Sequence, residues 1–140
     1  MIKIIKEKIE DKKNNLLEIY QGLKKLQSLK LKDLKENIEN LWAVNFGLVA
    51  GVEAMLDISQ YILTEKGIKI ESYSQIPIKL AEEKIIDKKF KEKMIQMLGF
   101  RNRAIHNYPS LDEKRVYEVL QKDIEDFKEF LKIIEKLKIK

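Results

Sequence analysis

A long run of apolar side chains at helical spacing is the feature that most limits how this chain can fold. Between residues 33 and 66, apolar residues recur at every third or fourth position, and in the middle of the segment they cover the helix nearly all round. They are Leu41, Val44, Leu48, Val52, Met55 and Ile62, with Trp42, Phe46 and Val49 beside them. A helix of this kind is buried on several sides, so the sequence predicts a core helix over 33–66 that ends at Gly67.

The segments on either side of this helix are also predicted to be helical. Residues 2–27 carry one apolar stripe, and residues 28–32 form a break before the core helix. A connector over 68–77 leads into a short helix, which we expect to begin at a Ser74 cap and to run through Ile86. Pro77 fits this helix because proline is tolerated in a first turn.

The C-terminal part of the chain predicts two further helices. Asp87 is a candidate cap for a helix over 88–108, which Pro109 ends. Ser110 and Glu113 have the spacing of a capping box before a last helix that runs to about residue 137. The inward-facing positions are Phe90, Met94, Met97, Leu98 and Ile105, then Val116, Leu120, Ile124, Phe127, Leu131 and Ile134. The fold class predicted is all-α, an antiparallel bundle of about five helices in a single domain over 1–140.

Composition excludes several kinds of site. The chain has no cysteine, so disulfides, zinc–thiolate centres and cysteine nucleophiles are excluded. Residues 1–13 alternate charges and show no secretory signal, and the apolar run 41–52 is too short to cross a bilayer. We therefore expect a soluble, cytoplasmic protein with no membrane partner. A net charge of +5 permits a polyanionic ligand without requiring one.

The stretch "GFRNRAIHNY" over 99–108 concentrates the rarest side chains of the sequence. Only three of the 28 basic residues are arginines, two of them lie here, and His106 is the only histidine. Asn102 and His106 are four residues apart, so they share a helix face and can hydrogen-bond. Arg101 and His106 lie about 140° apart around an ideal helix. They converge only if the arginine curls over the helix, the last turn loosens, or a second subunit completes the site.

These side chains suit the cleavage of a phosphodiester without a metal. An imidazole transfers protons near neutral pH, and a guanidinium fork fits a phosphate. Simpler interpretations remain: His106 caps the helix end, Arg103 is a solvated charge, and Tyr108 anchors the chain. The run Lys88, Lys89, Lys91 and Lys93 forms either a phosphate-attracting or a merely solvated face. Glu53 and Asp57 are four apart, but they lack a histidine nearby in sequence, so neither a metal nor a cofactor is expected.

The order Arg101-x4-His106-x-Tyr108, with Asn102 directly after the arginine, resembles the signature of HEPN-domain proteins. The HepT toxin branch, whose partner is a minimal nucleotidyltransferase (MNT) antitoxin, is the nearer likeness. The segments 44–63 and 71–86 are also similar to that branch, and the likeness covers about residues 33–135.

The resemblance implies a homodimeric helical bundle that cleaves RNA without a metal and leaves a cyclic phosphate. It implies that His106 handles protons, Arg101 binds or stabilises the phosphate, Asn102 supports the site, and Tyr108 is adenylylated by the MNT antitoxin. A related branch implies an alternative, a non-catalytic substrate-binding subunit of a nucleotidyltransferase. A structural bundle with an incidental histidine is the third reading. Because cleavage through the 2′-hydroxyl benefits from a base and an acid, we further expect a dimer to bring both His106 copies to one cleft.

Overall fold

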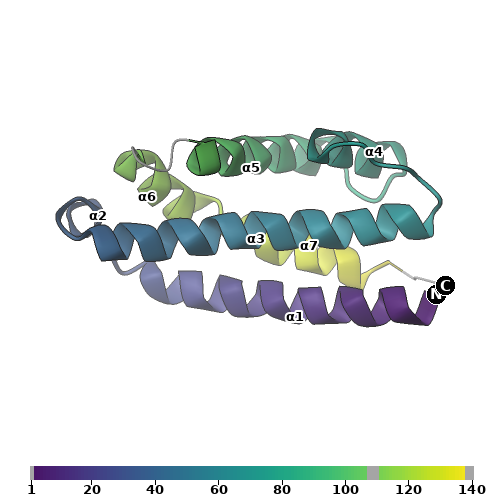
Figure 1. The fold of residues 1–140 in the computed structure, drawn as a ribbon, viewed down its shortest axis with the longest axis horizontal. Coiled ribbons are helices and arrows are strands. Elements are labelled where there is room, and N and C mark those ends of the chain that lie inside the picture. Colours follow the sequence, from purple (N-terminus) through teal and green to yellow (C-terminus); the bar gives the residue numbers. More distant parts are fainter. Residues whose placement is uncertain (1, 107–110, 138–140) are drawn as a thin grey trace.

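The protein is built from helices throughout the part that the structure describes. A computed structural model describes residues 2–106 and 111–137 and contains seven α-helices, one 3-10 turn and no strand within those ranges (Figure 1). The elements are α1 (Ile2–Leu26), α2 (Leu31–Glu36), α3 (Ile38–Glu65), η1 (Tyr73–Gln75), α4 (Ile76–Glu82), α5 (Lys88–His106), α6 (Glu113–Lys122) and α7 (Glu125–Glu135). The predicted all-α class is confirmed, but the predicted number of helices is too small by two.

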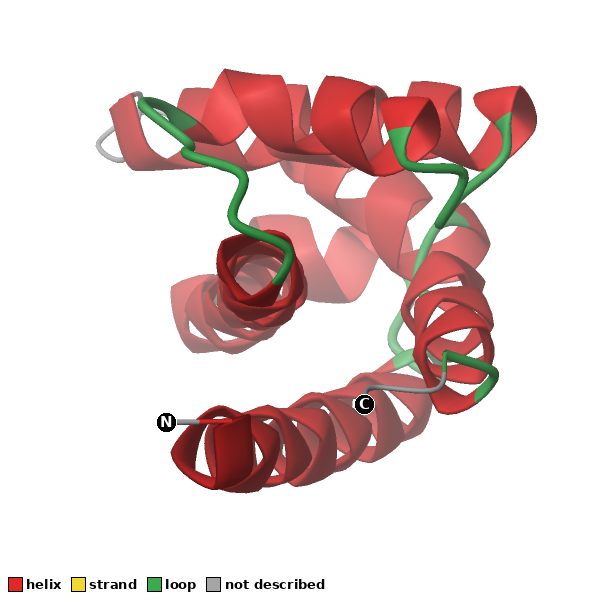
Figure 2. Ribbon diagram, turned by 90° about the vertical axis from the view of Figure 1, so that its right-hand side faces the viewer, coloured by secondary structure: helices red, strands yellow, loops and turns green. Residues whose placement is uncertain are grey.

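The core helix α3 lies at the centre of the bundle. Helix α1 packs along one side of it, α5 runs along the opposite side, and α7 packs against both α1 and α3 (Figures 1 and 2). Helix α1 begins, and α7 finishes, toward the same end of the bundle (Figure 1). At the other end, α6 contacts both α2 and α3, close to where α5 finishes. The last turn of α5 is therefore held beside the beginning of α3.

The first additional helix arises at Asn37, where the predicted helix over 33–66 is interrupted. The Asn37 backbone is extended, and its side chain accepts hydrogen bonds from the backbone N–H groups of Glu39 at 3.0 Å and Asn40 at 3.4 Å. Asparagine is a favoured N-cap because its side-chain oxygen satisfies N–H groups that have no partner within the helix. Asn37 consequently separates the short α2 from α3, which the apolar periodicity alone did not reveal.

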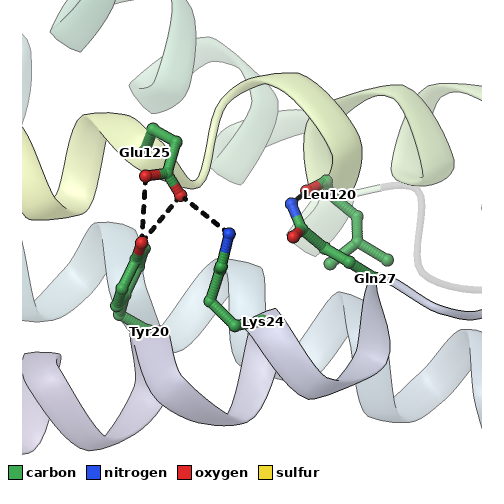
Figure 3. A network of polar contacts seen from close by, with 5 residues as sticks. All are labelled: Tyr20, Lys24, Gln27, Leu120 and Glu125. Atoms are coloured by element: carbon green, nitrogen blue, oxygen red, sulfur yellow. Dashed lines mark hydrogen bonds and ion pairs between the residues drawn. The ribbon is translucent and has the colours of Figure 1, made fainter.

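The second additional helix arises because the predicted last helix turns sharply between α6 and α7. Asp126 and Phe127 donate from their backbone N–H groups to carbonyls only three residues back. The Tyr20 hydroxyl of α1 donates to both carboxylate oxygens of Glu125, at 2.9 and 2.7 Å (Figure 3). On the α6 side, the Gln27 side chain donates to the Leu120 carbonyl oxygen at 3.0 Å. The turn is thus fixed by hydrogen bonds to Tyr20 in α1 and to Gln27 just after it, which are about a hundred residues away in sequence.

The expected helix ends are confirmed in two of three cases. Gly67 has a φ of +78° and ends α3, as predicted. Asp87 accepts a 2.7 Å hydrogen bond from the Phe90 backbone N–H and caps α5. The short helix differs, because it starts at Ile76 after η1 and ends at Glu82. Lys84 then takes a left-handed φ of +61°, which turns the chain out of the helix.

Two further cap predictions have different outcomes. Ser74 lies inside η1, with its hydroxyl 2.9 Å from that of Ser72, and does not cap a helix. Ser110, like residues 107–109, lies outside the described residues, and Asp112 caps α6 by accepting from the Arg115 backbone N–H at 3.2 Å.

The core contains most of the predicted inward-facing residues, and three of the exceptions lie together. Phe90, Met94, Met97 and Leu98 of α5 are buried, as are Leu41, Val44, Leu48, Val52, Met55 and Ile62 of α3. Trp42 is 47% exposed, Phe46 is 75% exposed and Ile105 is 43% exposed, so the prediction that these side chains are buried was wrong for this chain taken alone. All three belong to the ends of α3 and α5 that lie next to each other.

Helix α3 is also long and apolar enough to meet the length and composition criteria for crossing a membrane. In its most apolar window, however, 56% of the residues are buried inside the protein. This is the pattern expected of a helix that forms the core of a bundle.

Two glycines of α3 allow its neighbours to approach closely, and one of them supports a stability prediction. A Cβ atom at Gly51 would lie 2.5 Å from the ring of Phe127, which is fully buried. Gly51→Ala is therefore expected to lower the free energy of unfolding by about 1–3 kcal/mol, because the added methyl group overpacks the α3–α7 contact.

The matched control is Gly22→Ala in α1, where nothing lies within 4 Å of the added atom. That change is expected to raise the free energy of unfolding by about 0.5–1 kcal/mol, because alanine is the better helix former. Urea denaturation of both variants measures the difference. Equal effects of the two substitutions would contradict the packing described here.

A half-buried carboxyl group on α7, that of Asp126, gives a second stability prediction. Burial raises the pKa of Asp126 to about 6, and Lys93 at 3.6 Å offsets this only in part. The folded protein therefore holds a proton that the unfolded chain releases near pH 4, so this contribution to stability is complete below about pH 4 and is lost as the pH rises through 6. Asp126→Asn is expected to raise the free energy of unfolding at pH 7.5 by about 1–2 kcal/mol and to change it little at pH 4.

Thermal melts of wild type and Asp126→Asn across this pH range test the prediction. The matched control, Asp11→Asn, removes a carboxylate that is exposed on α1. A gain from Asp126→Asn that is as large at pH 4 as at pH 7.5 would count against the role given to burial.

Candidate functional site

Arg101 is held in place by two neighbouring elements near the end of α5. One of its terminal nitrogens, Nη2, lies 3.2 Å from Oε1 of Glu53 on α3, and Nη1 donates to Oδ1 of Asn102 at 3.0 Å. The guanidinium also lies over the ring of Tyr73, 5.5 Å from its centroid. Its Nε atom is buried and has no acceptor among the described residues. Arg101 is thus a fixed cation that still has an unused donor.

Asn102 contacts Arg101 and makes no hydrogen bond to His106. The predicted bond four residues along the helix is absent among the described residues, and the Asn102 side-chain oxygen accepts from Arg101 instead. Both Asn102 and His106 are exposed. The structure therefore brings together two of the predicted site residues, Arg101 and Asn102.

His106 occupies the last described turn of α5, with its side chain exposed. No hydrogen bond joins its imidazole to another described residue, so within residues 2–106 and 111–137 no partner fixes the ring. Its position follows from the helix, which places it five residues, or about 140°, from Arg101. An exposed imidazole can accept a proton from a bound ligand or donate one to it. Tyr108, the fourth predicted site residue, lies outside the described residues.

Glu53 and Asp57 of α3 and Lys93 of α5 each have an ion-pair partner. Glu53 pairs with Arg101, and Asp57 pairs with Lys12 of α1 at 3.3 Å. The two carboxylates therefore serve separate cations. Lys93 lies 3.0 Å from Glu129 on α7, and it is thirteen residues, or roughly 20 Å, from His106 along α5. The lysine run is thus distant from the His106 end of the helix.

Comparison with known proteins identifies the family. The model of the family described as "Ribonuclease HepT-like" matches residues 16–134, which is most of the chain. The chain belongs to the HepT-like family.

This HepT-like chain is similar in sequence to a curated protein. It is 31% identical to the "mRNA nuclease HepT" of Shewanella oneidensis over 83 residues, which make up 59% of this chain and 62% of the relative. The match thus spans less than two thirds of the relative's length.

Two solved structures share its fold. A tri-AMPylated HEPN toxin of Shewanella oneidensis in complex with an MNT antitoxin superposes with a TM-score of 0.83 at 24% identity, covering 92% of this chain and 97% of that one. YutE, a cytosolic protein of unknown function from Bacillus subtilis, has a TM-score of 0.73 at 18% identity, with 90% and 87% covered. At these identities the likeness establishes the fold.

Next to His106, the HepT-like chain carries an apolar surface, and the sequence reasoning assigned three of its residues, Trp42, Phe46 and Ile105, to the core. We call the exposed side chains Ile38, Trp42, Phe46 and Ile105 the apolar stripe. Three of them are four residues apart on α3 and lie on a different face from the buried positions. Trp42, Phe46 and Ile105 line a cavity of about 390 Å³ together with Asn45, Val49 and Ala104. The sequence does contain a pattern that could have revealed this surface, because Ile38, Trp42 and Phe46 recur every four residues.

Proposed function

We propose that this HepT-like protein is the ribonuclease toxin of a toxin–antitoxin pair and that it cleaves RNA without a metal ion. The observation that carries the proposal is the exposed His106 at the end of the helix that also holds the fixed pair of Arg101 and Asn102. Family membership, a relative named as an mRNA nuclease and a fold shared with a HEPN toxin support it. A chain acting on RNA would work in the cytoplasm.

In this proposal the chemistry needs only side chains of the chain. His106 removes the proton from a ribose 2′-hydroxyl, whose oxygen attacks the adjacent phosphorus and forms a cyclic phosphate. The 5′-oxygen of the next nucleotide leaves and takes up a proton. Arg101 stabilises the charge that develops on the phosphoryl oxygens, and Asn102 orients Arg101 through their 3.0 Å hydrogen bond. No cofactor takes part.

We further propose that two copies of the chain form a homodimer through the apolar stripe. Large exposed apolar side chains that adjoin one another mark interaction surfaces, and Phe46 is 75% exposed. Ile105 belongs to the stripe and directly precedes His106, so a two-fold contact here would bring both imidazoles to one cleft. One copy would then act as base and the other as acid, and the 140° between Arg101 and His106 would be bridged across the subunits.

The proposed regulator is an MNT antitoxin that transfers adenylate to Tyr108. The tri-AMPylated state of the solved HEPN toxin, in complex with its MNT antitoxin, supports this part. The alternative is a non-catalytic subunit that presents a substrate to a nucleotidyltransferase. One observation favours it: the Arg101 guanidinium pairs with Glu53, so its charge is partly neutralised.

Incubation of the purified chain with labelled RNA in the presence of EDTA tests the proposal. We expect cleavage products that end in a 2′,3′-cyclic phosphate, together with growth arrest when the chain is expressed without its partner. A chain that leaves RNA intact and is harmless alone would support the alternative. Cleavage that requires an added divalent cation would contradict the metal-free chemistry.

A further inference from the structure

The two arginines other than Arg101 line one cavity. Arg103 on α5 and Arg115 on α6 both line a cavity of about 200 Å³ between α3, α5 and α6, which we call the arginine pocket. Its other walls are Asn45, Phe100, Ala104, Leu111, Asp112 and Val116. All three arginines of a chain with 28 basic residues therefore lie on α5 and α6, within fifteen residues of one another. Arg103 is exposed, which agrees with the sequence reading of a solvated charge, but sequence reasoning did not connect it with Arg115.

Both guanidinium groups in the pocket keep most of their donors available. Arg103 forms no ion pair with a described residue, and its Nη1 lies 3.4 Å from the place where a Cβ atom at Gly99 would be. The Arg103 side chain therefore folds back along α5 toward Gly99. Arg115 has one partner, Glu118 at 3.8 Å, and both side chains of that pair are more than a third exposed, so the contact is weak.

Asn45 provides independent evidence that the pocket receives a ligand. Its side chain lines the pocket, the residue is only 7% exposed, and its Oδ1 atom has no hydrogen-bond partner among the described residues. Nearly all buried polar groups in proteins are hydrogen-bonded, so we expect a ligand to donate a hydrogen bond to Asn45 Oδ1. The same residue also lines the cavity of the apolar stripe, which places the pocket directly beside that surface.

The chemistry of the walls indicates one class of ligand. Two guanidinium forks fit the oxygens of a phosphate diester, and the apolar wall of Phe100, Leu111 and Val116 suits a ribose or base. Asp112 reduces the local positive charge, and its Oδ1 accepts from the Arg115 backbone N–H, which fixes the start of α6. A volume of about 200 Å³ is of the size of the sugar and phosphate of one nucleotide.

We infer that the arginine pocket is an RNA subsite, which holds a nucleotide of the bound strand away from the bond that is cut. Arg103 and His106 are three residues apart and therefore neighbours on α5, so a strand that passes His106 reaches the pocket within a short distance. The pocket is a binding element, and neither arginine takes part in the chemical step. This inference rests on the proposed function, since it assumes that the chain binds RNA.

The test uses full-length His106→Ala protein, which keeps the pocket and leaves the RNA uncut. The variants Arg103→Gln, Arg115→Gln and the double change are added to it, and the affinity for a fluorescein-labelled single-stranded RNA is measured by anisotropy over a range of salt. We expect each single change to weaken binding about tenfold at low salt, and each to reduce the salt dependence by about 0.7 in log K against log [salt]. Lys69→Gln, which removes one exposed positive charge at the far end of α3, is the matched control and is expected to have little effect.

The outcomes separate this inference from the proposed function. Reduced RNA affinity of the arginine variants supports the subsite, even if the wild-type chain proves unable to cleave RNA. If the wild-type chain cleaves RNA and the arginine variants bind it as tightly as Lys69→Gln does, the subsite is refuted while the ribonuclease stands. If the variants lose affinity only for the nucleotidyltransferase partner, the pocket serves a protein contact and the RNA assignment is overturned. Circular dichroism confirms that each variant is folded.

With His106 intact, a second measurement distinguishes binding from chemistry. Because the pocket is expected to hold the strand equally in the ground and transition states, Arg103→Gln should raise KM about tenfold and leave kcat nearly unchanged. A fall in kcat with constant KM would contradict the assignment of Arg103 as a binding residue.

Discussion

His106→Ala is expected to reduce RNA cleavage about a thousandfold and to remove growth arrest when the chain is expressed alone. General acid–base catalysis contributes on the order of 10²–10⁴ in rate. His106 is the only histidine in the sequence, so no other imidazole can replace it. Because His106 is exposed and makes no hydrogen bond to a described residue, its removal should leave the thermal midpoint unchanged. Rates under single-turnover conditions, together with melting curves, measure both effects.

The control for this prediction is Arg115→Gln, which also removes a polar side chain from this end of the bundle but lies in the proposed binding pocket. It should weaken RNA binding and retain kcat, whereas His106→Ala should retain binding and lose kcat. Partial recovery of His106→Ala by added imidazole would identify the missing group as the proton carrier. A His106→Ala protein that cleaves RNA at the wild-type rate would end the proposed mechanism.

The same variant tests the composite cleft. In a heterodimer of wild-type and His106→Ala chains, a site that needs both imidazoles retains one intact copy and should lose most of its activity. Two independent sites should instead retain about half of the wild-type rate. The pH–rate profile gives a second measure, because an acid and a base acting together produce a bell-shaped curve.

The sequence predicted the parts of this fold that depend on local patterns. Helical spacing of apolar residues located α1, the body of α3 and α5, because that spacing reflects a buried stripe. Gly67 and Asp87 were recognised as helix ends because a left-handed φ and a side-chain cap depend on the residue itself and its near neighbours.

The features that were missed depend on tertiary contacts or on competition between local signals. The turn between α6 and α7 is fixed by Tyr20 of α1, whose hydroxyl binds Glu125, and no local pattern contains that pairing. At Asn37, continued apolar periodicity concealed a strong N-cap. Trp42 and Phe46 are apolar residues at helical spacing, and composition cannot distinguish a face that packs inside one chain from a face left for a partner.

The sequence predicted which residues belong to the candidate site, but it did not predict how their side chains are arranged. The resemblance to HEPN-domain proteins singled out Arg101, Asn102 and His106. The side-chain contacts of Arg101 come from Glu53 and Tyr73, which are remote in sequence, so the motif could not predict that this guanidinium turns toward α3. Arg103 and Arg115 were likewise connected only when the fold brought α5 and α6 to one cavity.

In the proposed toxin–antitoxin pair, Tyr108→Phe is expected to abolish neutralisation by the nucleotidyltransferase partner while the proposed RNA cleavage is retained. In the proposed reaction the phenolic oxygen attacks the α-phosphorus of a nucleoside triphosphate, an O–P bond forms, pyrophosphate leaves and the phenol proton is released. Phenylalanine keeps the ring and lacks the oxygen, so no adenylate can be attached. Intact-mass spectra after co-expression should show added adenylate units on the wild-type chain and none on Tyr108→Phe.

Tyr117→Phe provides the matched control for this prediction, because Tyr117 is a partly exposed tyrosine on α6 that lies nine residues further along the chain. It should be adenylylated as wild type is, and cells that co-express the partner should grow. Cells that carry Tyr108→Phe should stop growing even with the partner present, since the adenylate phosphates that would repel an RNA strand are never added. If the partner silences Tyr108→Phe as completely as wild type, neutralisation proceeds by binding alone, and adenylylation of Tyr108 is not the mechanism of control.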